Sequence, residues 1–210
     1  RLMRTLARAA AAQRGAAEGL KDLGNGFAVH AQGNAARGAI TRDQFVSALV
    51  RLKHFGFGEG EANGLYAAFD SHHTNRVAWV DVLAAVRAVS GFRHEGAVGV
   101  LQGMFEVYDQ FGAAPVTTQT AHHLFLACAA SEADRTAVLT LYRQRFKFEM
   151  DRVLKENQAI VQIDGAGEKM TFGQINLQYF TEGLARCPLL VEEFENQMRG
   201  RMTANSKKKK

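Results

Sequence analysis

FDSHHTNRVAWVDVLAAV, residues 69–86, decides the fold that we predict for this chain. An aromatic residue and an aspartate precede a polar run, which holds one apolar residue, Val77, and Asp81 then opens an apolar segment. Apolar residues follow helical spacing in that segment, at Val80, Leu83, Ala84 and Val86. The order predicts a helix, a loop of about a dozen residues and a second helix.

The same order recurs at three other places in the chain. GNAARGAITRDQF (33–45) has Ile40 inside its loop, and GMFEVYD (103–109) leads into a loop that contains Val116. DGAGEKMTFGQI (164–175) has Met170 as its inner apolar residue. We expect the inner residues of paired loops to be neighbours across short antiparallel bridges, Ile40 with Val77 and Val116 with Met170.

This series resembles the EF-hand superfamily, in which helix–loop–helix units pair into lobes. The resemblance runs from about Phe27 to Phe194. It implies an all-α protein with two lobes, like calmodulin and the neuronal calcium sensors, built from four degenerate units. We place an N-terminal lobe in 1–90, preceded by a basic, Ala-rich helix, and a connecting helix in 91–103. A C-terminal lobe follows in 104–200 and a basic tail in 201–210.

Calcium needs about six to eight oxygen ligands, and EF-hand loops supply a bidentate carboxylate at position 12. At positions 1, 3, 5 and 12 the first loop has Gly33, Ala35, Arg37 and Gln44, and the second has Asp70, His72, Thr74 and Asp81. The third has Asp109, Phe111, Ala113 and Thr120, and the fourth has Ile163, Gly165, Gly167 and Gln174. We expect no metal ion or other cofactor, with Asp70 and Asp81 as the only weak metal candidates.

Three stretches are similar to the calaxin-like family, EF-hand proteins of the ciliary outer dynein arm docking complex. They are HFGFGEGEANGLYAAFD (54–70), AAVRAVSGFRHEGAVGVLQGMFEVYD (84–109) and LARCPLLVEEFENQM (184–198). The resemblance implies the axoneme of a cilium or flagellum, with coiled-coil docking subunits, dynein-associated proteins and tubulin as partners. Neuronal calcium sensors and calcineurin B share the layout, so a calcium-responsive regulatory subunit stays open as an alternative.

An ion-free pair of EF-hands keeps an apolar groove that a partner helix can fill. We expect the core and partner groove of the C-terminal lobe to include Phe105, Tyr108, Leu124, Phe125, Phe146, Phe148, Met150, Phe172 and Phe180. Large apolar patches are rarely exposed on a soluble monomer. The sequence therefore favours a calcium-independent structural adapter that is held in a stable hetero-complex.

Motif and composition exclude several other classes. The chain has no G-x-S-x-G, P-loop, H-E-x-x-H or kinase signature, so we expect no enzyme. No apolar run approaches the roughly 18 residues of a membrane span. Cys128 and Cys187 lack the paired spacing of zinc or redox sites, which predicts buried free thiols in the cytoplasm or cytoskeleton.

The formal charge of +5 lies mainly at the two ends of the chain. No aromatic residue interleaves with the lysines of SKKKK (206–210), which argues against a nucleic-acid partner. A solvated tail is the simpler interpretation, and contact with an acidic surface such as a microtubule is the more specific one.

Overall fold

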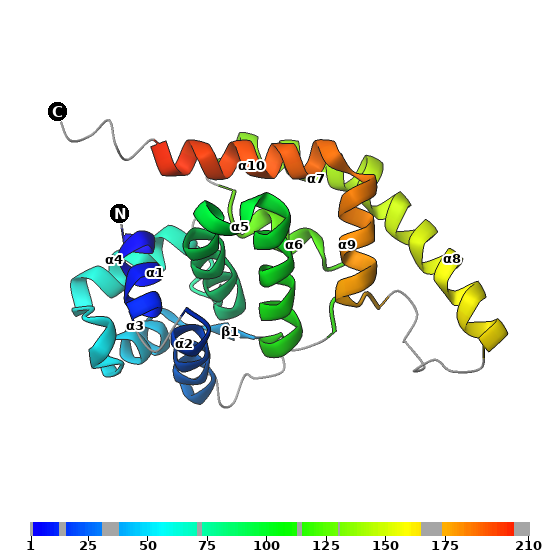
Figure 1. The fold of residues 1–210 in the computed structure, drawn as a ribbon. Helices are drawn as coiled ribbons and strands as arrows, with labels where there is room; N and C mark the ends of the chain where they lie inside the picture. The colour runs from blue at the N-terminus through cyan, green and yellow to red at the C-terminus, as the bar shows by residue number, and fades with distance from the viewer. Residues whose placement is uncertain are drawn as a thin grey trace.

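The computed structural model describes residues 2–12, 16–30, 38–70, 73–112, 115–129, 131–164 and 174–203. These residues are mostly helical, which confirms the predicted all-α class (Figure 1). In chain order the elements are α1 (Leu2–Ala12), α2 (Ala16–His30), β1 (Ala39–Ile40), α3 (Arg42–Arg51), the 3₁₀ turn η2 (Lys53–Phe55), α4 (Glu59–Phe69), β2 (Val77–Ala78), α5 (Trp79–Phe111), α6 (His122–Leu126), α7 (Glu132–Leu141), the π-helical turn η3 (Tyr142–Phe146), α8 (Lys147–Asp164), α9 (Leu177–Arg186) and α10 (Pro188–Thr203).

The first two loops meet through the short strands β1 and β2. These strands are antiparallel and place Ile40 opposite Val77, as the sequence predicts. Gly38 enters β1 with a φ of 58°, a left-handed conformation that glycine adopts without steric cost. Thr41 then begins α3 through a capping box with Gln44, so the chain turns directly from strand into helix.

The third and fourth loops also meet, but in a register that differs from the predicted one. Thr117 pairs with Gln174 in an isolated antiparallel bridge, and the Ile175 amide donates to the Val116 carbonyl at 2.9 Å. In this register Val116 faces Ile175, which directly precedes the helix cap Asn176. Met170, the predicted partner of Val116, lies outside the described residues.

Aromatic side chains build the core of the first two units. The ring of Phe27 stacks on Phe45 at 5.1 Å and lies 6.4 Å from Trp79. Phe111, from the far end of α5, packs edge-on against Trp79 at 6.1 Å. The two ends of α5 therefore share one apolar cluster.

A second aromatic cluster forms the core of the later units. Phe105 stacks on Phe180 at 4.9 Å, and Phe146 contacts both Phe180 and Phe125, at 5.8 and 5.4 Å. The long helix α10 covers this part of the chain, packing against α5, α7 and α9 along the top of the molecule (Figure 1). Its buried apolar side chains include Leu190, Phe194 and Met198.

Helix α5 is broken at Gly96, whose φ of 69° and ψ of −178° are not helical. The Arg87 guanidinium in the first half pairs with Glu95 at 2.6 Å. A side-chain carbon on Gly103, in the second half, would lie only 2.4 Å from Arg87, so the two halves fold back against each other. The break falls within residues 91–103, the segment in which we predict a connecting helix.

Helices α7, η3 and α8 follow one another without interruption. Helix α8 runs beside α9 and then extends away from the body of the molecule (Figure 1). Of the described helices, none combines the length and apolar character that crossing a membrane requires.

Candidate functional site

Asp70, one of the two weak metal candidates, is buried at the end of α4. Its carboxylate accepts hydrogen bonds from the Thr74 amide at 2.7 Å, the Thr74 hydroxyl at 2.9 Å and the Asn75 amide at 2.9 Å. Burial acts to raise the pKa of Asp70, but these hydrogen bonds outweigh it and hold the pKa below its usual value. The loop itself therefore satisfies this carboxylate.

Asn75 stands where a calcium loop has glycine, and it adopts the same left-handed conformation with a φ of 57°. Asparagine tolerates this region better than most side chains. The sharp turn of the second loop is thus kept without glycine.

Asp81, the second metal candidate, is half-buried in the first turn of α5. Its carboxylate accepts the hydroxyl hydrogen bond of Tyr108, which lies 27 residues further along the same helix. Burial raises the pKa of Asp81, against the opposing effects of the Tyr108 hydrogen bond and of Arg135 and His122. The Asp81 carboxylate therefore bonds to Tyr108 at the far end of α5 and not to a donor in its own loop.

The residues at the twelfth position of the first and third loops also bond to the chain itself. The Gln44 side chain accepts from the Thr41 amide at 2.8 Å, and the Thr120 hydroxyl accepts from the Thr117 amide at 2.9 Å. Both side chains thereby satisfy an amide at the start of the following helical segment. In three of the four predicted loops, the side chain at the predicted twelfth position accepts a hydrogen bond within the chain.

Asp70 and Asp81 line one cavity of about 540 Å³, which lies between the second helix–loop–helix unit and the segments α6 and α7. We name it the interunit cleft. Its charged or aromatic wall residues are Phe69, Asp70, Arg76, Asp81, His123 and Arg135. Residues from three separate stretches of the chain therefore meet here.

Within the part of the chain that the structure describes, no group of three or more His, Cys, Asp or Glu side chains is arranged to hold a metal ion. The rings of His122 and His123 lie 4.2 Å apart, and His122 Nδ1 lies 2.7 Å from the Gln119 carbonyl oxygen. Burial lowers the pKa of both histidines. Six residues at predicted loop positions lie outside the described part of the chain: Gly33, Ala35, Arg37, His72, Gly165 and Gly167.

Both cysteines are buried and neither forms a disulfide, as predicted. Burial raises the pKa of the Cys187 thiol to about 11. The thiolate is the reactive form, so this side chain is protonated and inert near neutral pH.

The predicted partner groove is closed in this structure. Its residues Phe105, Leu124, Phe125, Phe146, Met150 and Phe180 are buried, Tyr108 is half-buried, and only Phe148 is strongly exposed, at 64%. Phe172 lies outside the described residues. Because these side chains pack against one another and helix α10 packs on α5, α7 and α9, those that the structure describes as buried form core and are not accessible to a partner helix.

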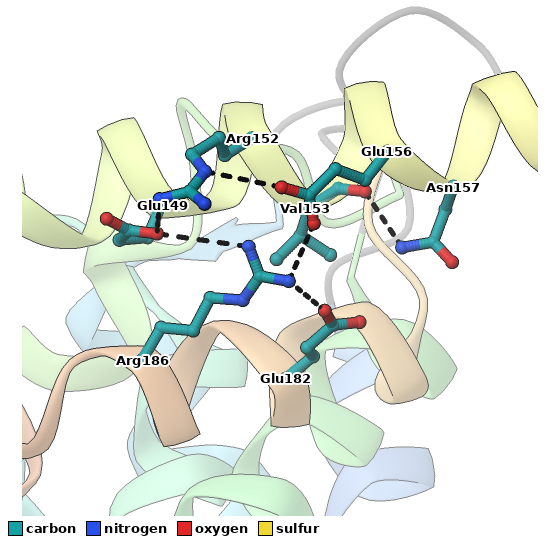
Figure 2. Close-up of polar contacts among 7 residues, drawn as sticks. All are labelled: Glu149, Arg152, Val153, Glu156, Asn157, Glu182 and Arg186. Carbon is teal, nitrogen blue, oxygen red and sulfur yellow. Dashed lines mark hydrogen bonds and ion pairs between the residues drawn. The ribbon is translucent and has the colours of Figure 1, made fainter.

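An ionic network on α8 and α9 is a feature that the sequence analysis missed (Figure 2). Arg186 on α9 pairs with Glu156 at 2.7 Å and with Glu149 at 3.9 Å, both on α8, and with its own-helix neighbour Glu182. Arg152 links Glu149 and Glu156 at 3.6 and 3.2 Å. The spacing of four residues between Glu182 and Arg186 could have predicted their ion pair from the sequence. The contacts of Arg186 with α8 could not be predicted in this way.

This network joins α8 to α9 and changes the pKa of Glu156. Hydrogen bonding from Arg186 is the main influence that lowers the pKa of Glu156. Exposed ion pairs contribute little to stability one at a time, so we expect only a small stabilisation from each of these contacts.

Comparison with known proteins identifies no family for this chain: no family model matches it, and neither the curated proteins nor the solved structures yield a significant match.

Proposed function

We propose that this chain is a calcium-independent structural adapter with four degenerate EF-hand units in two lobes. Support comes from the repeated local geometry, above all the antiparallel pairing of Ile40 with Val77 between helix-flanked loops. The link between Thr117 and Gln174 repeats the arrangement in the second pair. This pairing of loops is what the EF-hand resemblance leads us to expect.

One observation carries the calcium independence. The side chains of Gln44, Asp81 and Thr120, each at the twelfth position of its loop, accept hydrogen bonds from donors within the chain. A calcium ion would have to break these bonds and would find few carboxylates in return. In this proposal, bonds within the chain take the place of an ion in the described parts of these three loops, and the adapter has no calcium switch.

Calorimetric titration with Ca²⁺ tests this proposal directly. We expect no binding heat, and the same melting temperature in calcium and in chelator, for the wild-type protein and for an Asp70→Ala/Asp81→Ala variant. A ligand that binds only the folded state raises the melting temperature, by an amount that grows with the ratio of free ligand concentration to Kd. A calcium-dependent rise in the wild type that disappears in the double variant would show a working second loop.

That contrary outcome would favour the second candidate function, a calcium-responsive regulatory subunit of the neuronal-calcium-sensor or calcineurin B type. Its support is that Asp70 and Asp81 both line the interunit cleft. Rotation of Asp81 away from Tyr108 would bring a second carboxylate toward the loop.

We further propose that the adapter works in a stable hetero-complex on the axoneme of a cilium or flagellum, at the docking site of the outer dynein arm. The calaxin-like stretches support this address, and the expected partners are coiled-coil docking subunits, dynein-associated proteins and tubulin. The lysines of 206–210, which we expect at the acidic tubulin surface, lie outside the described residues.

Tagging the full chain in a flagellated cell tests the address. We expect signal along the axoneme that resists extraction by mild detergent. Signal that spreads through the cytosol and is lost on extraction would contradict the axonemal role and leave the soluble regulatory subunit as the better account.

A further inference from the structure

Because the groove predicted for a partner helix is closed, the contact surface of an adapter has to lie elsewhere. The interunit cleft is open to solvent, and its two carboxylates are already hydrogen-bonded. Asp70 accepts three hydrogen bonds from its own loop, and Asp81 accepts one from Tyr108. Their charges remain, but their oxygens are largely committed to donors within the chain.

The cleft also holds two guanidinium groups, those of Arg76 and Arg135, beside its two carboxylates. The side chain of Arg76 is exposed at the wall, and no carboxylate among the described residues lies within ion-pair distance of it. Arg135 is half-buried on the opposite wall, where its charge acts on Asp81. An arginine guanidinium has five N–H donors in a fixed fork that matches a carboxylate.

Much of the remaining wall is apolar, beside Thr74 and His123. Phe69 and Leu126 are half-buried there, and Val77, Ala78 and Ala127 are among their neighbours. Small aliphatic surface beside guanidinium groups suits a short peptide with acidic and small apolar side chains, because the peptide pairs its charges while it covers the apolar wall.

We propose that the interunit cleft is a docking site for an acidic peptide segment of a protein partner, whose carboxylates pair with Arg76 and Arg135. The site deepens the adapter function proposed above and rests on it. Because the cleft uses residues from the second unit and from α7, a bound peptide bridges the two parts of the chain. Docking needs no calcium.

Selection from a random dodecapeptide library displayed on phage tests the site with the intact chain in the presence of chelator. We expect the selected peptides to be enriched in Asp and Glu beside small apolar residues. A fluorescein-labelled selected peptide should bind Arg76→Gln and Arg135→Gln at least about tenfold more weakly than wild type, the scale of a lost charged hydrogen bond. Arg8→Gln, an exposed arginine on α1, is the matched control and should bind like wild type.

Circular dichroism and melting temperature establish that each variant is folded, and Arg76→Gln, at an exposed position, carries the test if Arg135→Gln unfolds. Selected peptides without carboxylates, unchanged binding by Arg76→Gln, or arginine-dependent binding of a labelled oligonucleotide in place of the acidic peptide would each overturn the site. If that happens while the tagged chain still resists extraction from the axoneme, the cleft assignment falls and the adapter function stands.

Discussion

Asp81, which the sequence predicts as a weak metal candidate, makes a structural contact within the chain. Its carboxylate joins the first turn of α5 to Tyr108 near the other end of that helix. The residue thus supports the fold-back of α5 at Gly96. A charge placed here is costly, because burial is the strongest influence on its pKa.

Replacing Asp81 with Asn should stabilise the protein at neutral pH. The amide oxygen still accepts the Tyr108 hydrogen bond, and the half-buried charge is removed. Because folding raises the pKa of Asp81, wild type and variant should match best below the unfolded pKa of 3.8. The variant should gain as pH rises, by about 1.4 kcal/mol for each unit by which folding raises that pKa, and level off above the folded pKa.

Urea unfolding of both proteins between pH 4 and pH 8 measures this difference. Tyr108→Phe is the matched control, because it removes the hydroxyl and leaves the carboxylate without its donor, so it should destabilise the protein. A less stable Asp81→Asn at pH 7 would mean that attraction from Arg135 outweighs burial.

At the scale of elements, the contact between α1 and α2 depends on a glycine. A side-chain carbon on Gly19 would lie 2.1 Å from the backbone carbonyl oxygen of Ala10. The obstructing atom belongs to a helix backbone, which cannot move aside as a flexible side chain can. The close packing of α1, which brings Leu6 and Ala10 into the core, therefore requires a residue without a side chain at position 19 of α2.

Gly19→Ala should lower the free energy of unfolding by about 1–3 kcal/mol, the usual range for an overpacked contact. Gly60→Ala makes the same chemical change on α4, where nothing lies within 4 Å of the added carbon. It should raise stability, by up to about 1 kcal/mol, through helix propensity. Urea melts of the two variants side by side check the pair, and a Gly19→Ala protein as stable as wild type would show that α1 does not pack closely on α2.

At the scale of the whole molecule, α10 covers the aromatic core of the later units. Phe194 is fully buried, whereas Leu189 on the same helix is 55% exposed. The helix makes the groove part of the interior and leaves the interunit cleft as the candidate contact surface.

Phe194→Ala should cost about 3–5 kcal/mol of stability, because it opens a cavity in the closed core. Leu189→Ala, the control on the same helix, should change stability by no more than about 0.5 kcal/mol. Chemical denaturation measures both. If Phe194→Ala were as mild as Leu189→Ala, α10 would not be docked on the core in solution.

The sequence by itself determined the features that depend on local spacing. The repeated order of helix, loop and inner apolar residue predicted the helices and the pairing of Ile40 with Val77. The same spacing named Asp70 and Asp81 as the acidic residues of the second loop, and both line the cleft. These features follow from periodicity and from helix-capping preferences, which act within a few residues of the chain.

Only the tertiary structure decided the contacts between distant stretches. Asp81 meets Tyr108 across 27 positions, and Glu156 meets Arg186 across 30. The bridge register of the fourth loop, the covering of the aromatic core by α10 and the assembly of the cleft also depend on which faces pack together. Such packing reflects shape and burial summed over the whole chain, and no local pattern encodes it.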